Sequence, residues 1–321
     1  MTASRIVWHR PLLALATAMA ALAVVAAVGS VIDPRQITGV PLWNKPLLFA
    51  VSVGLYAVTL AWLLGLLTRH RRLAHQVGTI AAGGLAIEMI IIVGVALAGT
   101  TSHFNVSTPL ATALWGIMAV SIVVVWMLGV PLAIMLFRTD LGDPARALAI
   151  RAGLIIALAG MGLAFLMTGP QGDQITNYSG IVGAHTVGPP DGGAGLPLVG
   201  WSTVGGDLRI PHFVGMHALQ LVPLTALLLE LLARRVPALR DAGTRFGIVW
   251  VVVALYVALL GLVTAQALAG ESILHPDPVV VAVVTAVVAA AVLVIVGVIV
   301  RRRPYTKTAQ CQPLPSAESA P

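Results

Sequence analysis

The stretch 200–220, GWSTVGGDLRIPHFVGMHALQ, gathers residues that can do chemistry in a chain with only 10% charged residues. Its polar members are Asp207, Arg209, His212, His217 and Gln220. Histidine binds metals and moves protons near neutral pH, and a neighbouring carboxylate or amide orients its ring. The stretch therefore predicts a functional site in which Asp207 and Arg209 position the reacting groups.

The two histidines of this stretch do not form a site by themselves. They are five residues apart, so on a helix they project about 140° from each other. This is not the spacing of an HExxH zinc helix. A shared site needs a further ligand, and we expect His103, in the string SHFN, to supply it. The predicted metal ligands are thus His103, His212 and His217, with His185 as a further candidate.

These residues favour one function and leave two others open. The first is a membrane enzyme that binds a metal or haem and acts on a lipid-soluble substrate. For a cofactor, we expect His103 and His217 as ligands and Gln220 as an orienting group; zinc would activate water. The second is a proton-coupled transporter of a small molecule. The third is a structural membrane protein whose polar residues only hydrogen-bond a loop to the bundle.

Glu88 is a candidate catalytic residue that moves protons in the enzyme, and it would be the coupling group of the transporter. It lies about halfway along an apolar segment, where an ionised side chain costs a few kcal/mol unless it is protonated, paired or hydrated. An acidic residue in this place is a candidate for proton movement. Lys45 has two interpretations: an amine that reaches the membrane interface, or a contact for an anion at the outer site.

The elements that position these residues are membrane-spanning helices. The chain has 321 residues, 58% of them hydrophobic, and a mean hydropathy of +0.96. A spanning helix needs about 20 mostly apolar residues, and the fold class is therefore an all-α polytopic membrane bundle. The predicted helices are 11–32, 46–67, 78–98, 109–137, 147–168, 211–232, 245–267 and 279–300.

The basic residues predict how the bundle sits in a bacterial inner membrane. With both termini in the cytoplasm, 16 of the 19 basic residues fall on the inner side, as the positive-inside rule requires. The net charge of +7 then reports topology, and we expect the lipid bilayer and no nucleic acid as partner. The first apolar run is too long for a cleaved signal peptide. His103, His185, His212, His217 and His275 all fall on the outer side.

Residues 1–300 form a single predicted domain. The connection 169–210 is rich in glycine but too apolar for a solvated linker, and we expect an ordered cap over the outer end of the bundle. It contains no GxGxxG spacing between a strand and a helix, which argues against nucleotide binding. Residues 301–321 are expected to be a disordered cytoplasmic tail.

Three strings, KPLLFA, SHFN and GWSTVGGDLRIPHFVGMHALQ, resemble those of a family of uncharacterised multi-pass bacterial integral membrane proteins. The resemblance covers most of the bundle. It implies the membrane class, and no activity or site residue follows from it.

Overall fold

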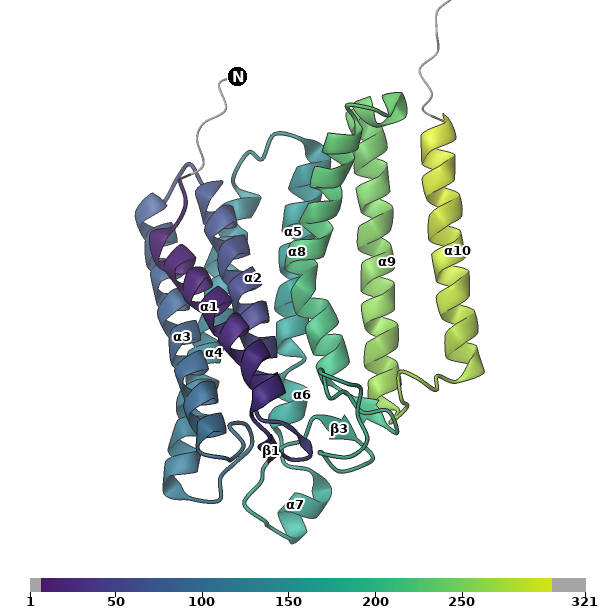
Figure 1. Ribbon diagram of the computed structural model, residues 1–321. Helices are drawn as coiled ribbons and strands as arrows, with labels where there is room; N and C mark the ends of the chain where they lie inside the picture. Colours follow the sequence, from purple (N-terminus) through teal and green to yellow (C-terminus); the bar gives the residue numbers. More distant parts are fainter. Residues whose placement is uncertain (1–6, 302–321) are drawn as a thin grey trace, which may run out of the picture.

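The computed structural model describes residues 7–301, which form a bundle of long helices (Figure 1). Within this range, eight spans are long and apolar enough to cross a membrane, and the predicted all-α polytopic fold is confirmed. The spans are α1 (Arg10–Ile32), α2 (Asn44–Gly65), α3 (Arg71–Leu97), α4 (Pro109–Phe137), α5 (Pro144–Gly162) with the short α6 (Phe165–Thr168), α8 (Arg209–Leu232), α9 (Ala242–Leu268) and α10 (Pro278–Arg301). The expected tail lies outside the described residues from 302 onward.

Local capping explains where several helices begin. The Thr108 side chain accepts a hydrogen bond from the Ala111 amide at 3.1 Å, and Pro109 occupies the first turn of α4. Asp143 caps α5 in the same way, and Asp241 caps α9 after the short 3-10 helix η1 (Pro237–Arg240). Such caps satisfy amides that have no partner within the helix.

One predicted boundary was wrong. Helix α3 begins at Arg71, seven residues before the predicted start, because the helix continues past the apolar run through a polar first turn. The fifth span ends at Thr168 as predicted, and a turn within it separates α5 from α6. Hydropathy reports where lipid contact ends, and the helical backbone can stop earlier or later than that point.

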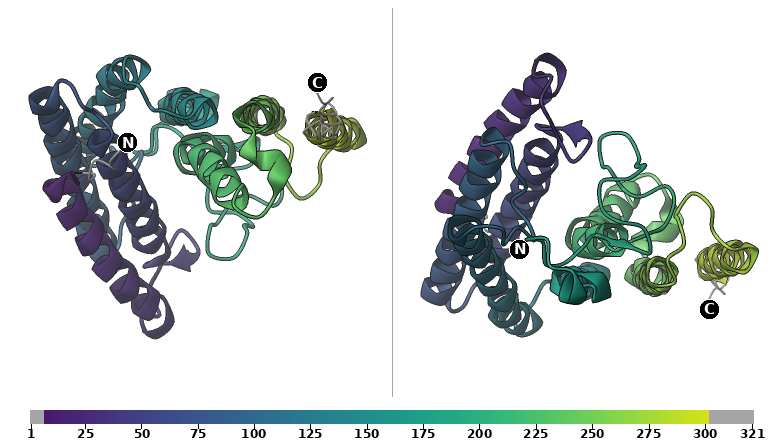
Figure 2. Two further views of the ribbon diagram at one scale, coloured as in Figure 1. Left: turned by 90° about the horizontal axis from the view of Figure 1, so that it is seen from above. Right: turned by 90° about the horizontal axis from the view of Figure 1, so that it is seen from below.

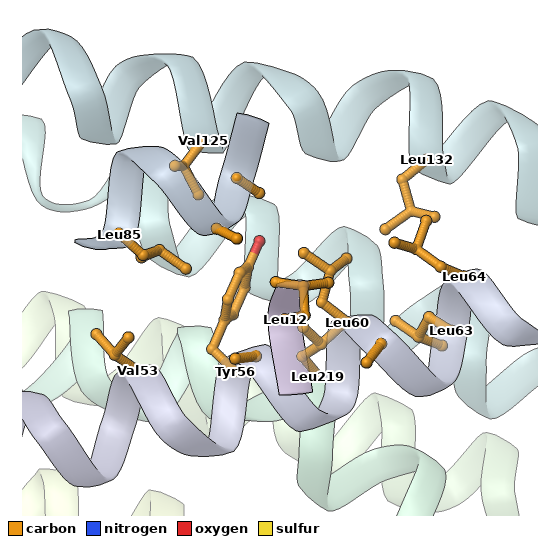
Figure 3. Close-up of a cluster of buried hydrophobic side chains, with 14 of the residues drawn as sticks. Leu12, Val53, Tyr56, Leu60, Leu63, Leu64, Leu85, Val125, Leu132 and Leu219 are labelled. Atoms are coloured by element: carbon orange, nitrogen blue, oxygen red, sulfur yellow. The ribbon is translucent and has the colours of Figure 1, made fainter. Parts of the chain in front are cut away.

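The helices pack in two groups (Figure 2). Helices α1 to α4 form most of a large apolar cluster that includes Leu12, Leu60 and Leu132, and α5 and α8 join it through residues such as Leu154 and Leu219 (Figure 3). Helices α5, α8 and α9 surround a second cluster. Helix α10 packs against α9 at the edge of the bundle.

The closest helix crossing is between α5 and α8. A Cβ atom on Gly160 would lie 2.3 Å from the Cα of Gly215, so only glycine permits this approach of the two backbones.

The connection after α6 folds over one end of the bundle (Figure 1). It contains α7 (Gly172–Thr176) and an antiparallel pair formed by β3 (Thr186–Val187) and β4 (Gly206–Asp207). A small hairpin of β1 (Gln36–Ile37) and β2 (Val40–Pro41) lies at the same end. Residues 7 and 301 lie at the opposite end. That this opposite end faces the cytoplasm stays a prediction from the arginines.

Candidate functional site

His103 links a lysine to a buried carboxyl group. The Lys45 Nζ atom lies 3.0 Å from His103 Nδ1, and His103 Nε2 lies 3.8 Å from Glu88 Oε1. Lys45 is in the first turn of α2, and Glu88 is in α3, nine residues or about 13 Å before its cap-side end. Three residues from separate segments thus form a line from the capped end into the bundle. We call this line the Lys45–His103–Glu88 relay.

The loop between α3 and α4 is held in place by the cap. Phe104 adopts a left-handed backbone with φ of 64°, which turns the chain toward the bundle. Its carbonyl accepts a hydrogen bond from the Val182 amide at 2.9 Å, and the Val106 amide donates to the Gly180 carbonyl at 2.8 Å. Asn105 closes the turn by accepting from the amide and hydroxyl of Ser107. These contacts explain the dense polar turn in the sequence, and they fix the position of His103.

The chemistry of the neighbours sets the protonation of the His103 ring. A protonated lysine amine can only donate, so Nδ1 of His103 accepts and its proton sits on Nε2, facing Glu88. Burial lowers the pKa of His103 well below its ordinary value, and electrostatic interactions with Lys45, His185 and His212 lower it further. The ring is therefore neutral at neutral pH, with one nitrogen facing each partner.

Glu88 is almost completely buried, with 3% of its surface exposed. Its Oε2 atom has no hydrogen-bond partner among the described residues, and its Oε1 atom faces His103. Lys45 is the cation that acts on Glu88 electrostatically. A buried charge is costly unless it is paired. Whether the Glu88 carboxyl group is ionised therefore depends on Lys45 and His103.

The cap adds a second histidine pair near the relay. His185 Nδ1 lies 2.6 Å from Asp191 Oδ2, and the His185 ring contacts the Phe104 ring in a tilted arrangement with 4.8 Å between centroids. Burial lowers the pKa of His185 although Asp191 counteracts it. For Asp191, burial alone would raise the pKa, but hydrogen bonds from His185 and Thr186 outweigh it and hold the pKa below its usual range.

Asp207 and Arg209 form a buried latch where the cap meets α8. The Asp207 side chain is fully buried and accepts from the Ser202 amide at 2.8 Å, the Arg209 amide at 3.0 Å and the Arg209 guanidinium at 2.6 Å. The same guanidinium donates to the Gly200 carbonyl at 2.6 Å. The two residues thus tie the cap to the start of α8, which is a positioning role.

The three histidines predicted as metal ligands are not brought together. His212 Nδ1 faces the Gly160 carbonyl at 2.9 Å. His217 Nδ1 lies 3.2 Å from Gln220 Oε1, and its ring packs on Phe213. Within residues 7–301, no group of three or more His, Cys, Asp and Glu side chains could hold a metal ion. Only His103 belongs to the relay.

The expected pocket at the capped end is nearly closed. A polar cavity of about 20 Å³, room for one water molecule, is lined by Thr186, Ser202 and Arg209 among others. This cavity lies within the cap and does not reach the relay, in which Lys45 and His103 are partly exposed and Glu88 is buried.

Sequence reasoning left Lys45 with two interpretations, and it found neither the contact of Lys45 with His103 nor the pairing of His185 with Asp191. A usable signal was present: Lys45 is the one lysine within residues 7–301, where every other basic side chain besides histidine is arginine. A lysine can lose its proton when buried, whereas arginine stays charged.

No protein-family model, curated protein or solved structure matches the chain.

Proposed function

We propose that the protein is a proton-coupled membrane transporter in which the Lys45–His103–Glu88 relay loads a proton onto Glu88 from the capped side. The observation that carries this proposal is the position of His103, with one ring nitrogen 3.0 Å from an amine and the other 3.8 Å from a buried carboxyl group. A histidine in this place can accept a proton on one nitrogen and release another from the second.

The transfer balances as two linked proton shifts. An N–H bond of the Lys45 ammonium breaks as a proton binds Nδ1 of His103, and the Nε2–H bond breaks as a proton binds the Glu88 carboxylate. The charges change from +1, 0 and −1 to three neutral groups. Because each buried ion costs several kcal/mol of desolvation, the neutral state can compete with the ion pair. Lys45 then regains a proton from the capped side.

The distance from His103 to Glu88 defines a gate. At 3.8 Å it exceeds a hydrogen bond, so the second shift needs a small movement of either side chain or a bridging water. The loop that carries His103 is bonded to the cap through Phe104 and Val106. Movement of the cap would therefore control the transfer from His103 to Glu88.

Coupling to a small-molecule substrate follows from where the relay lies. Lys45 and Glu88 belong to the group α1 to α4, whereas the cap continues directly into α8 of the other group. Motion of one helix group against the other is a general means of alternating access. For the alternative of a metal-binding membrane enzyme, residues 7–301 contain no group of three or more His, Cys, Asp and Glu side chains that could hold the ion.

The test is charge displacement after a pH jump, measured on proteoliposomes adsorbed to a solid-supported membrane. This signal needs no transported substrate. We expect a transient current in the native protein that Glu88→Gln abolishes. Lys45→Arg keeps the positive charge but cannot release a proton, and it should also abolish the current. His275→Gln, an exposed histidine at the same end of the bundle, is the matched control. A native current in Lys45→Arg and Glu88→Gln would overturn the proposal.

A further inference from the structure

An apolar groove of about 380 Å³ separates α4 from α5 near the end opposite the cap. Its walls are Val130, Ala133, Ile134 and Phe137 of α4 and Ile155 and Leu158 of α5. Positions three and four apart lie on one face of a helix, so each wall is a continuous stripe. The groove runs along the helices and is shaped for a chain.

A close helix crossing closes the groove at the end nearer the cap. A Cβ atom on Gly129 would lie 2.4 Å from a methyl group of Leu158, and the Trp126 indole donates to the Leu158 carbonyl at 2.9 Å. From this crossing toward the end opposite the cap, α4 and α5 leave the space between them open as far as the turn at residue 138. The occupant must therefore enter from the membrane or from the helix ends.

Both stripes end in arginine. Arg138 follows Phe137 on α4 and lines the groove, and Arg151 lies one turn before Ile155 on α5. The Arg151 guanidinium lies 5.5 Å from the centroid of the Phe137 ring and donates to the Thr139 carbonyl at 3.1 Å. The open end of the groove thus carries Arg138 in its wall and the Arg151 guanidinium against the Phe137 ring.

These two arginines have no acidic partner in the described part of the chain, unlike their neighbours. At the same end of the bundle, Arg146 pairs with Glu230, and Arg245 pairs with Asp143. Neither Arg138 nor Arg151 forms an ion pair with a carboxylate in residues 7–301, and Arg138 is exposed. The unpaired positive charge of Arg138 and Arg151 at the open end of the groove complements an anionic group attached to an apolar chain.

We propose that this groove binds one anionic phospholipid, with an acyl chain along the α4 and α5 stripes and the headgroup phosphate between Arg138 and Arg151. A basic site between membrane helices at the cytoplasmic side is the usual setting for an anionic lipid headgroup. Guanidinium groups bind phosphate oxygens through paired hydrogen bonds. This site is separate from the relay and does not depend on the proposed transport.

The experiment is competitive lipid binding to the purified full-length protein, followed by native mass spectrometry. The probes are dioleoyl phosphatidylglycerol and dioleoyl phosphatidylcholine at equal concentration. The native protein should retain phosphatidylglycerol preferentially. Arg138→Gln should reduce that preference about fivefold, the effect of one basic residue near an anionic surface. Arg235→Gln, an exposed arginine at the same end, is the matched control and should leave the preference unchanged.

A second variant tests the groove itself. Val130→Phe fills the part of the groove nearer the cap while both arginines stay. It should release the bound lipid. Size-exclusion profiles and helical circular dichroism show that each variant is folded. An unchanged preference in Arg138→Gln, or an equal loss in Arg235→Gln, would overturn the proposed headgroup site. Retention of the lipid by Val130→Phe would show binding at the headgroup alone and would contradict an acyl chain in the groove.

Discussion

Asp207→Asn should release the cap from the bundle while the helices stay folded. Asp207 has 1% of its surface exposed, and its carboxylate accepts hydrogen bonds from Ser202 and from both the backbone and the guanidinium of Arg209. Asparagine has nearly the same shape, but it loses the charge that holds the guanidinium. One of its two polar atoms becomes a donor that faces other donors.

The size of the effect follows from this geometry. Breaking a buried ion pair by removing one partner costs about 3–5 kcal/mol. Because the Arg209 side chain remains 29% exposed, water can solvate part of its charge, and the lower figure applies. A loss of about 3 kcal/mol corresponds to a cap that opens about 100-fold more often.

Hydrogen exchange measures this opening. Peptides that cover residues 186–209 should exchange about 100-fold faster in Asp207→Asn, with the amides of Ser202 and Arg209 most affected. Peptides from α2 and α3 should keep the native rate. Asp277→Asn, which removes an exposed carboxylate at the start of α10, is the control. Cap exchange within about twofold of the native rate would refute the latch.

Two further perturbations test other parts of the structure. Gly160→Ala should separate α5 from α8 at Gly215 and lower the free energy of unfolding by about 1–3 kcal/mol, measured by thermal unfolding, whereas Gly261→Ala, where a Cβ meets no atom within 4 Å, should not destabilise. For His103 the pKa in the folded protein is below its ordinary value of 6.5, so the unfolded chain binds the proton first and stability is lost as the pH falls below about 6.5. His103→Gln should make this pH dependence of the unfolding temperature less steep and His275→Gln should not; equal slopes in both variants would contradict the burial of His103.

The fold was predictable because its main determinant is local. A run of apolar residues long enough to cross a membrane defines a helix without reference to the rest of the chain. Helix α4 matches its predicted bounds because Thr108 and Pro109 mark its start in the sequence. The start of α3 was not predictable in this way, since its first turn is polar and only the helical backbone continues through it.

The site was only partly predictable because it depends on contacts between distant segments. Glu88 was identified from its depth in an apolar run, and this reasoning needs no partner. The position of His103 depends on hydrogen bonds between its loop and residues 180 and 182 of the cap, about 80 positions away in the sequence. Helical spacing also could not show that His212 faces Gly160 instead of another histidine.

The most direct measurement is infrared difference spectroscopy of the carboxyl group of Glu88 in lipid after a rapid drop in pH. A band of a protonated carboxyl group should rise in the native protein and be missing in Glu88→Gln. Positioned proton transfer by one side chain accelerates a reaction about 100-fold or more, so His103→Gln should slow the rise by at least that factor, whereas His275→Gln should not. A band that rises at the native rate without His103 would contradict the relay.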